Sequence, residues 1–437
     1  MPPGMLEVRC AAQALRGSLE PPGDKSISHR ALILGSLATG ETEIDGLLHS
    51  ADVLATRDAL AQLGVTINDA GGRVRIQGRG AAGLAAPVKP LDLGNSGTAM
   101  RLLCGVLAAQ TFDSELRGDA SLSRRPMRRI IDPLRSMGAD IRAAEQFTAP
   151  LAIRGRPLRG LDYSSPVASA QVKSCLLLAG LFAEGRTRVR EMLTSRDHTE
   201  RMLDLFGAAL DDEGWIHGGS TLSAACVSVP ADISSAAFPL AAALLVPGSD
   251  ILLRNVGLNP TRTGLLDALQ AMGAGLEIRE TAGKTFEPAG DIRVRYNDRL
   301  QATSVTAAQV PSMVDEIPVL MALAATAEGV TKIRGAAELR VKESDRLAVM
   351  GSALQGLGVG IELYPDGADI EGRAHLGGAA LVDSAGDHRC AMSLAILALG
   401  LKPGLGIAGA EYIGTSYPGF VADLRALGAE MKMAETA

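Results

Sequence analysis

The sequence is poor in aromatic residues. Only 3% of its 437 residues are aromatic, and it contains a single tryptophan. Proteins that bind single-stranded nucleic acid depend on aromatic side chains that stack on the bases, so the composition argues against that class. The formal net charge of −6 also argues against a partner that is a nucleic acid or a membrane surface, because both are themselves anionic.

Long hydrophobic runs are missing as well. The longest apolar runs, such as residues 236–247 and 175–183, span about a dozen residues or fewer, whereas a helix that crosses a bilayer needs about 20. Residues 1–10 lack the succession of basic, apolar and small residues that marks a signal peptide.

Cysteine is scarce, with five scattered residues and no pairing motif. Cys104, Cys175 and Cys390 lie inside apolar segments, which predicts buried free thiols and a reducing, cytoplasmic location. The six histidines show no spacing typical of a metal site. Residues 78–83 match a dinucleotide-binding string but are followed by prolines rather than a helix. We therefore expect neither a metal nor a cofactor.

An internal repeat is the most informative feature that is present. A helix-like segment recurs six times and ends each time at a glycine that is followed by Ala or Val. Glycine suits the end of a helix, where a left-handed backbone conformation is needed. These glycines lie 66 to 85 residues apart, at Gly64, Gly138, Gly207, Gly273, Gly358 and Gly428.

A second, more apolar helix recurs with the same rhythm. Its copies begin near Ser28, Gly97, Ala168, Ser234, Ile317 and Cys390. Helices that are apolar nearly all round should be interior, and the amphipathic helices that end in the repeated glycines should lie nearer the surface. The repeat predicts an α/β protein of six units of about 70 residues. Because a chain of this length is too long for one ordinary core, we expect three units in each of two domains.

A polar loop precedes each apolar helix. Helix capping explains part of this pattern, since Ser, Thr, Asn and Asp are common N-cap residues. Capping does not require cations such as Lys25, Arg30 and Arg389. The N-terminus of a helix with a nearby Lys or Arg is a site for anions. If the six units converge, their loops would suit a substrate that carries several negative charges.

Two further segments are rich in basic residues. Residues 124–129 contain four arginines, for which a solvated surface is the alternative interpretation. Residues 340–346 place Lys342 and Arg346 four positions apart, which predicts that they share one helix face, with Glu343 between them in sequence. A carboxylate among cations can act as an acid only if burial or a bound anion favours its protonated form.

Several motifs of the sequence resemble those of the EPSP synthase (5-enolpyruvylshikimate-3-phosphate synthase) family. The resemblance runs from about residue 22 to residue 420, and its motifs occur in the family's order. Features of both the class I and the class II branches occur. The matching segments are residues 25–30, 94–101, 125–127, 169–174, 195–200, 340–346 and 387–389.

The resemblance implies two similar domains, each of three βαβαββ units around buried parallel helices, the inside-out α/β barrel of enolpyruvyl transferases. Residues 24–234 would form the domain with most contacts to shikimate 3-phosphate. Residues 1–23 and 235–437 would form the domain with the catalytic carboxylates and part of the phosphoenolpyruvate site. The substrates would bind between the domains, which would close on them.

The implied reaction belongs to the shikimate pathway of aromatic amino acid biosynthesis. It transfers the enolpyruvyl group of phosphoenolpyruvate to the 5-hydroxyl of shikimate 3-phosphate by addition and elimination, and releases phosphate. No cofactor takes part, and a cytoplasmic monomer is expected. Asp315 is the implied base for the hydroxyl, Glu343 the implied proton donor to C3, and Lys25 a cation that touches both substrates.

Matching each motif in turn assigns the binding residues. Those implied for shikimate 3-phosphate are Lys25, Ser26, Arg30, Ser169, Ala170, Gln171, Arg196, Asp315 and Lys342. Those implied for phosphoenolpyruvate are Lys25, Asn95, Gly97, Arg125, Gln171, Glu343, Arg346, His388 and Arg389.

The sequence departs from the class I pattern at two places. Residues 414–418 lack the lysine that class I members carry there, and Glu338 replaces an asparagine. Gly97, in place of the alanine of tolerant class II members, leaves room for the inhibitor glyphosate, and we expect measurable inhibition.

Two alternatives stay open. UDP-N-acetylglucosamine enolpyruvyl transferase shares the fold and the donor, but that family has Asn where this chain has Ser26, and it usually carries a cysteine in a mobile loop. A repeat scaffold that binds an anion without chemistry would need no acid or base among its cations. Asp315 and Glu343 argue against such a scaffold.

Overall fold

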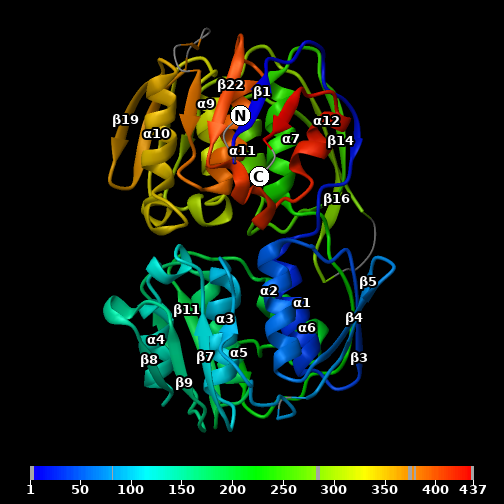
Figure 1. The fold of residues 1–437 in the computed structure, drawn as a ribbon, viewed down its shortest axis with the longest axis vertical. Helices are drawn as coiled ribbons and strands as arrows, with labels where there is room; N and C mark the ends of the chain where they lie inside the picture. The colour runs from blue at the N-terminus through cyan, green and yellow to red at the C-terminus, as the bar shows by residue number, and fades with distance from the viewer. Residues whose placement is uncertain (1–3, 81, 282–285, 373–375, 378–379, 435–437) are drawn as a thin grey trace. The chain divides into compact units, whose positions relative to one another are not determined.

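The structure is a computed structural model, and it describes residues 4–80, 82–281, 286–372, 376–377 and 380–434 (Figure 1). The chain forms two compact units. Unit 1 combines Met1–Pro22 with Pro230–Ala437, and unit 2 is Gly23–Val229. The two units repeat one arrangement of elements.

In unit 2, three buried helices form the interior. They are α1 (Lys25–Leu37), α3 (Gly97–Ala108) and α5 (Ala170–Gly180). Helix α3 contacts both α1 and α5 (Figure 1). Three helices with more polar residues lie outside them, α2 (Ala51–Gln62), α4 (Arg128–Ser136) and α6 (His198–Leu205). Short 3-10 helices are η1 (Leu122–Arg124) and η2 (Glu145–Phe147).

Small mixed sheets complete unit 2, in the orders β13-β3-β5-β4, β6-β7-β9-β8 and β10-β11-β12. In each sheet the first pair is parallel and the following pairs are antiparallel. Their strands are β3 (Glu41–Asp45), β4 (Thr66–Ala70), β5 (Arg73–Gln77), β6 (Leu91–Asp92), β7 (Asp113–Arg117), β8 (Asp140–Ala143), β9 (Leu151–Arg154), β10 (Asp162–Ser165), β11 (Arg186–Glu191), β12 (Trp215–His217) and β13 (Cys226–Ser228).

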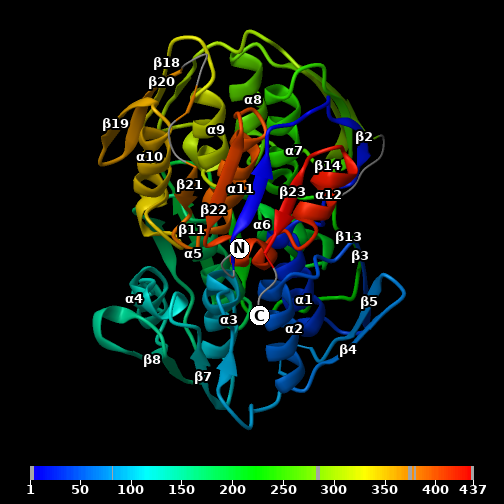
Figure 2. The ribbon, with the colours of Figure 1, turned by 45° about the horizontal axis from the view of Figure 1, so that its top comes forward.

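Unit 1 has the same inner layer. Helices α7 (Ile233–Leu245), α9 (Ile317–Ala324) and α11 (His388–Ala398) contact one another and are buried (Figure 2). Their sequences are apolar nearly all round, which favours this interior position. The outer helices are α8 (Gly264–Ala271), α10 (Arg346–Gly356) and α12 (Phe420–Ala426). The 3-10 helices are η3 (Val310–Ser312), η4 (Ala337–Val341) and η5 (Ala410–Thr415).

The N-terminal strands belong to the sheets of unit 1. Strand β2 pairs in parallel with β14, and β1 lies between β22 and β23. The sheet orders are β2-β14-β16-β15, β17-β18-β20-β19 and β21-β22-β1-β23. The strands are β1 (Leu6–Arg9), β2 (Arg16–Leu19), β14 (Asp250–Gly257), β15 (Gly275–Glu280), β16 (Ala289–Arg295), β17 (Ser304–Val305), β18 (Val330–Ile333), β19 (Gly360–Tyr364), β20 (Gly367–Glu371), β21 (Leu381–Asp383), β22 (Gly404–Ala408) and β23 (Met431–Met433).

The predicted repeat is confirmed. The six repeated glycines follow the outer helices and all have positive φ, from 82° at Gly273 to 111° at Gly428. A side chain with a Cβ is strained in that conformation, which explains why the repeat keeps glycine there. The α/β fold of two similar three-unit halves therefore follows the rhythm read from the sequence.

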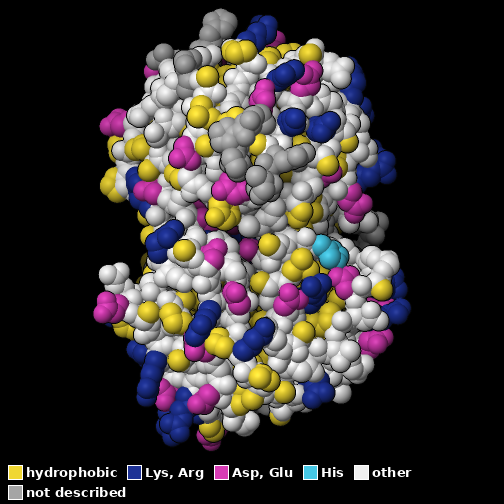
Figure 3. Space-filling view, viewed as in Figure 1, with side chains coloured by type: hydrophobic (Ala, Val, Ile, Leu, Met, Phe, Trp, Pro, Cys, Tyr) yellow, Lys and Arg dark blue, Asp and Glu magenta, His cyan; other side chains and the backbone are white. Residues whose placement is uncertain are grey.

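The remaining composition-based expectations concern the surface and the thiols. Cys104, Cys175 and Cys390 are buried free thiols, as expected, while Cys226 is exposed. No helix in the described part of the chain combines the length and the apolar character needed to cross a membrane. On the face drawn in Figure 3, basic and acidic side chains are interspersed on each unit.

Candidate functional site

Each buried helix except α9 starts at a residue whose side chain caps its backbone. Asp24 accepts a hydrogen bond from the backbone N of Ile27 at 2.9 Å, and Asp387 accepts one from that of Arg389 at 2.9 Å. Ser96, Ser169 and Asp232 cap α3, α5 and α7 in the same way. Capping thus explains the acids and serines of these loops but not the cations beside them.

The start of α1 carries two of those cations. Lys25 Nζ donates to Asp52 Oδ2 at 2.9 Å. Arg30 is buried, and its guanidinium donates to Ser26 O at 2.8 Å, to Thr199 Oγ1 at 2.6 Å and to Ser174 Oγ at 2.6 Å. These three acceptors are uncharged oxygens. They tie Arg30 to α5 and α6, so the guanidinium is held in place before any anion binds.

His29 lies between these cations in sequence and is buried, and like Lys25 it contacts helix α2. Its Nδ1 lies 2.7 Å from Thr56 Oγ1 on α2. Burial, followed by the charges of Lys25 and Arg30, lowers the pKa of His29 well below its usual value. His29 is therefore neutral near pH 7 and links α1 to α2.

The start of α3 brings together a second set of candidate residues. Arg125 Nη1 donates to the carbonyl oxygen of Asn95 at 3.3 Å, and Arg125 Nη2 donates to Asn95 Oδ1. A Cβ built on Gly97 would lie 3.0 Å from Arg101 Nη1 and 3.3 Å from Arg125 Nη1. Glycine at this position therefore leaves space for both guanidinium groups.

Gln171 connects the starts of α3 and α5. Its Oε1 accepts from Arg101 Nη1 at 2.5 Å, and its Nε2 donates to Thr98 Oγ1 at 2.9 Å. Ser169 caps α5 and Ala170 is the first residue of that helix. The structure thus brings Gln171 to Thr98 and Arg101 of the 94–101 segment.

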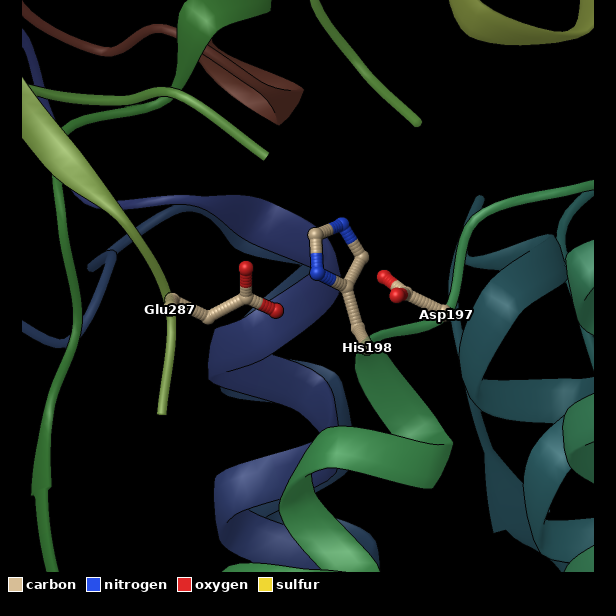
Figure 4. A group of neighbouring side chains, drawn as sticks. All are labelled: Asp197, His198 and Glu287. Atoms are coloured by element: carbon tan, nitrogen blue, oxygen red, sulfur yellow. The ribbon is translucent and has the colours of Figure 1, made fainter. Parts of the chain in front are cut away.

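Arg196 lies in the loop before α6. Its neighbour Ser195 is buried, and Asp197 is the N-cap residue of α6. Figure 4 shows Asp197 and His198 at the N-terminal end of this helix. Asp197 Oδ2 accepts from Arg201 Nε at 2.8 Å, one turn further along. The loop that carries Arg196 is therefore anchored at the end where α6 begins.

In unit 1, Arg346 is the centre of the candidate acid and base residues. Its side chain is 2% exposed and contacts three carboxylates: Asp387 at 2.9 Å, Glu343 at 2.6 Å and Asp315 at 3.2 Å. Lys342 Nζ lies 3.7 Å from Asp315. The predicted base, the predicted proton donor and two predicted cations are thus in one group of contacting side chains.

The charges in this group shift one another's ionisation. Burial is the largest influence on Asp387 and raises its pKa, but the charges of Arg346 and His388 and the hydrogen bond from Arg346 together lower it further, so the net pKa lies below the usual value. Burial acts in the opposite sense on Arg346, where Asp387, Glu343 and Asp315 together raise the pKa above its usual value. Asp387 and Arg346 are therefore an ionised pair.

One detail of the predicted geometry is wrong. Lys342 and Arg346 do not share a helix face, because η4 ends at Val341 and α10 begins at Arg346. The reason is that Asp345 caps α10, with its Oδ1 accepting from the backbone N of Ala348 at 3.0 Å. Both cations nevertheless contact Asp315. The turn between η4 and α10, and not a shared helix face, places them beside it.

Arg389 approaches the same place from the start of α11. Its Nη1 donates to the carbonyl oxygen of Asp315 at 3.4 Å and lies 3.6 Å from Glu316 Oε1. The side chain of Glu316 is fully buried and accepts a hydrogen bond from Ser234 Oγ. His388, the first residue of α11, is buried beside Arg389.

Reasoning from sequence did not single out four residues that hold these groups in place. They are Asp52, Arg101, Glu316 and Asp387. Asp387 lies in the matching segment 387–389, but its pairing with Arg346 joins positions 41 apart, and no spacing rule reveals such a contact. Glu316 carried a weak signal, as a second carboxylate directly after Asp315.

The chain is similar to known proteins over nearly its whole length. The family model described as EPSP synthase (3-phosphoshikimate 1-carboxyvinyltransferase) matches residues 10–424. A protein of Alkalilimnicola ehrlichii named 3-phosphoshikimate 1-carboxyvinyltransferase is 54% identical over 93% of this chain and 92% of its own length. One of the same name from Methylococcus capsulatus is 52% identical over 96% of both chains.

A solved structure gives the same result. EPSP synthase from Acinetobacter baumannii is 43% identical and superimposes with a TM-score of 0.86, covering 99% of this chain and 100% of that one. Both the level of identity and the extent of the match exceed what a shared fold alone would give. The chain belongs to the EPSP synthase family.

Proposed function

We propose that this protein transfers the enolpyruvyl group of phosphoenolpyruvate to the 5-hydroxyl of shikimate 3-phosphate and releases inorganic phosphate. The observation that carries the proposal is the contact group of Asp315, Lys342, Glu343 and Arg346, in which two carboxylates lie among cations. An anion-binding scaffold would gain nothing from acidic side chains that compete with its ligand. An addition and elimination reaction needs both a base and an acid.

In the proposed first step, Asp315 takes the proton of the 5-hydroxyl of shikimate 3-phosphate. The oxygen of that hydroxyl attacks C2 of phosphoenolpyruvate, and Glu343 gives a proton to C3. In the second step, the bond from C2 to the phosphate oxygen breaks and C3 returns a proton to the Glu343 carboxylate, which restores the double bond. The proton on Asp315 leaves with the released phosphate. Two phosphates and two carboxylates must be held together throughout. Cations fixed in advance by the protein reduce the cost of gathering them.

Arg346 gives this proposal a specific order of events. A carboxylate that is paired with Arg346 at 2.6 Å accepts hydrogen bonds, whereas a proton donor must first be protonated. A bound phosphoenolpyruvate anion would compete with Glu343 for Arg346. Binding of the donor would thereby release Glu343 to take up the proton that it delivers to C3.

In unit 2, we assign Lys25, Ser26, Arg30, Ser169, Ala170, Gln171 and Arg196 to shikimate 3-phosphate, with Asp315 and Lys342 from unit 1. For phosphoenolpyruvate we assign Lys25, Asn95, Gly97, Arg125, Gln171, Glu343, Arg346, His388 and Arg389. The support for Arg30 is its burial and its hydrogen bonds to Thr199 and Ser174, which fix the position of its guanidinium group. We also propose that the protein acts as a monomer in the cytoplasm, in keeping with its free thiols.

The test is phosphate release with phosphoenolpyruvate and shikimate 3-phosphate, with UDP-N-acetylglucosamine as the parallel acceptor. Release with shikimate 3-phosphate alone is the expected result. Release with UDP-N-acetylglucosamine alone would support phosphoenolpyruvate as the donor but contradict shikimate 3-phosphate as the acceptor. Absence of release with both acceptors, despite binding of phosphoenolpyruvate, would favour the anion-binding scaffold.

A further inference from the structure

Lys173 belongs to the 169–174 motif, but its ammonium group contacts the protein's own carboxylates. Its Nζ lies 3.0 Å from Glu191 Oε2 and 2.7 Å from Glu200 Oε1, and its side chain is 8% exposed. Burial lowers the pKa of Lys173, but the two carboxylates raise it more, and the net pKa lies above the usual value. The charge of Lys173 therefore balances acids inside unit 2.

Glu191, the last residue of β11, is the more informative partner. Its carboxylate is 7% exposed and accepts hydrogen bonds from two separate segments. Oε1 accepts from the backbone N of Ser169 at 3.1 Å. Oε2 accepts from the backbone N of Ser195 at 3.2 Å and from Ser195 Oγ at 2.8 Å. One buried carboxylate thus joins the N-cap of α5 to the loop before α6.

These two segments carry Ser169 and Arg196, which are both assigned above to shikimate 3-phosphate. A serine at a helix N-terminus and an arginine are groups that suit a phosphate. The backbone N–H of Ser169 donates a hydrogen bond to Glu191. Arg196 directly follows Ser195, whose backbone N–H donates another. A loop residue such as Arg196 presents a fixed charge only if its backbone is held. Hydrogen bonds from backbone N–H groups to a buried carboxylate are among the stronger means of holding it.

Resting on the function proposed above, we infer that Glu191 is a positioning residue for the phosphate of shikimate 3-phosphate, and that Lys173 holds Glu191 in place. Glu191 touches no substrate itself. It fixes the distance between Ser169 and the loop that carries Arg196, so that both reach the same phosphate. Its effect should fall on the phosphate of the acceptor, and not on the rest of the acceptor or on phosphoenolpyruvate.

A purely structural ion pair is the competing interpretation, and buried ion pairs are by themselves weak evidence for any role. The two interpretations differ in their pattern of affinities. A loss of fold would weaken all ligands together. A displaced phosphate subsite would weaken shikimate 3-phosphate while leaving shikimate, which lacks the phosphate, bound as before.

The test is Glu191→Gln, with dissociation constants measured by calorimetry for shikimate 3-phosphate, shikimate and phosphoenolpyruvate. Glutamine keeps the shape but replaces one acceptor oxygen with an NH₂ group that faces other donors. We expect the affinity for shikimate 3-phosphate to fall about tenfold or more, the usual cost of weakened hydrogen bonds to a charged group. The other two constants should stay within about twofold, the level of substitutions outside a binding contact.

Glu43→Gln is the matched control. Glu43 also lies on a strand of unit 2 and pairs with arginines, Arg75 at 2.9 Å and Arg73 at 3.3 Å, but away from the two segments. All three dissociation constants should be unchanged in the Glu43→Gln protein. Ser195→Ala is the second variant, because it removes only the hydroxyl donor to Glu191; the same selective loss, of smaller size, is expected.

Equal weakening of shikimate and shikimate 3-phosphate in both variants would overturn the inference, as would unchanged affinities for all ligands. Failure of the proposed function is distinguishable from these outcomes. It would appear in the unsubstituted protein, as absence of phosphate release with shikimate 3-phosphate.

Discussion

Arg346 and Asp387 form an ion pair in which the Arg346 side chain is 2% exposed and the Asp387 side chain is fully buried, with 2.9 Å between Nε and Oδ2. The contact joins the start of α10 to the start of α11. It holds Arg346 from one side while Glu343 and Asp315 contact the same guanidinium through its other nitrogens. Asp387 therefore fixes the cation on which the proposed acid and base depend.

Removing this anchor should destabilise the protein. Asp387→Asn keeps a side-chain oxygen that can cap α11. It removes the negative charge that faces the buried guanidinium of Arg346. We expect the free energy of unfolding to fall by about 3–5 kcal/mol, the usual cost of breaking a buried pair by removing one partner. Urea unfolding of both proteins measures the difference. Asp383→Asn, on an exposed strand residue, is the control and should change little.

The same pair predicts a dependence on pH. The pKa of Asp387 is lowered in the folded state, so its stabilisation is complete above the pKa of the unfolded chain, about 4. That stabilisation is lost as pH falls through the lower, folded pKa. The difference in unfolding free energy between the original protein and Asp387→Asn should therefore be constant near neutral pH and shrink in acid. A difference that grows in acid would contradict the assignment.

Much of the fold was predictable, because it repeats. The six glycines and the six apolar helices recur at regular distances, and the observed helices α1, α3, α5, α7, α9 and α11 begin within three residues of the predicted starts. Repetition gave each element several independent signals. The turn at residues 342–345 had only one such signal, the spacing of Lys342 and Arg346, which predicted a shared helix face. That prediction failed because Asp345 caps α10, so that the helix begins only at Arg346.

The site was predictable only in part, for a physical reason. The residues assigned to substrate contacts lie in recognisable motifs, such as 25–30 and 340–346. Residues that hold those side chains do so by contacts between distant segments, as Glu191 holds Ser169 and Asp52 holds Lys25. No periodicity or spacing in the chain marks such a pair. The assignment of each substrate contact stays a prediction that the following variants test.

Glu343→Gln tests the proposed proton donor. Glutamine has the shape of glutamate but cannot deliver a proton, so kcat should fall by about 10²- to 10⁴-fold, the usual contribution of general acid catalysis. The dissociation constant of shikimate 3-phosphate should be retained, because Arg346 keeps its bond to Asp387. Steady-state kinetics and calorimetry measure the two quantities. Glu328→Gln, on an exposed residue of the same unit, is the control, and a kcat within threefold of the original in Glu343→Gln would exclude the role.

Arg125→Lys tests the geometry at the start of α3. The guanidinium of Arg125 uses two nitrogens on Asn95, and a lysine ammonium group cannot reproduce that fork. We expect the KM for phosphoenolpyruvate to rise about 10- to 100-fold, as for one lost hydrogen bond to a charged group. The KM for shikimate 3-phosphate should change much less. Arg128→Lys is the control, because Arg128 is exposed and pairs with Asp132; an equal rise in both variants would refute the assignment.

Gly97→Ala tests whether space at the start of α3 governs binding of the donor. The added methyl group would lie 3.0 Å from Arg101 Nη1 and 3.3 Å from Arg125 Nη1, closer than an ordinary contact, so both guanidinium groups must shift by a few tenths of an ångström. The first position of a helix accepts alanine well, and so stability should be unchanged or higher by about 0.5 kcal/mol.

We therefore expect a higher KM for phosphoenolpyruvate and a higher inhibition constant for glyphosate without any loss of thermal stability. Gly275→Ala is the matched control, because a methyl group there makes only an ordinary contact with the backbone at 3.9 Å. A Gly97→Ala protein with unchanged kinetics would show that the guanidinium groups move aside at no cost. A protein that is less stable would show instead that the added methyl group disturbs the helix rather than the site.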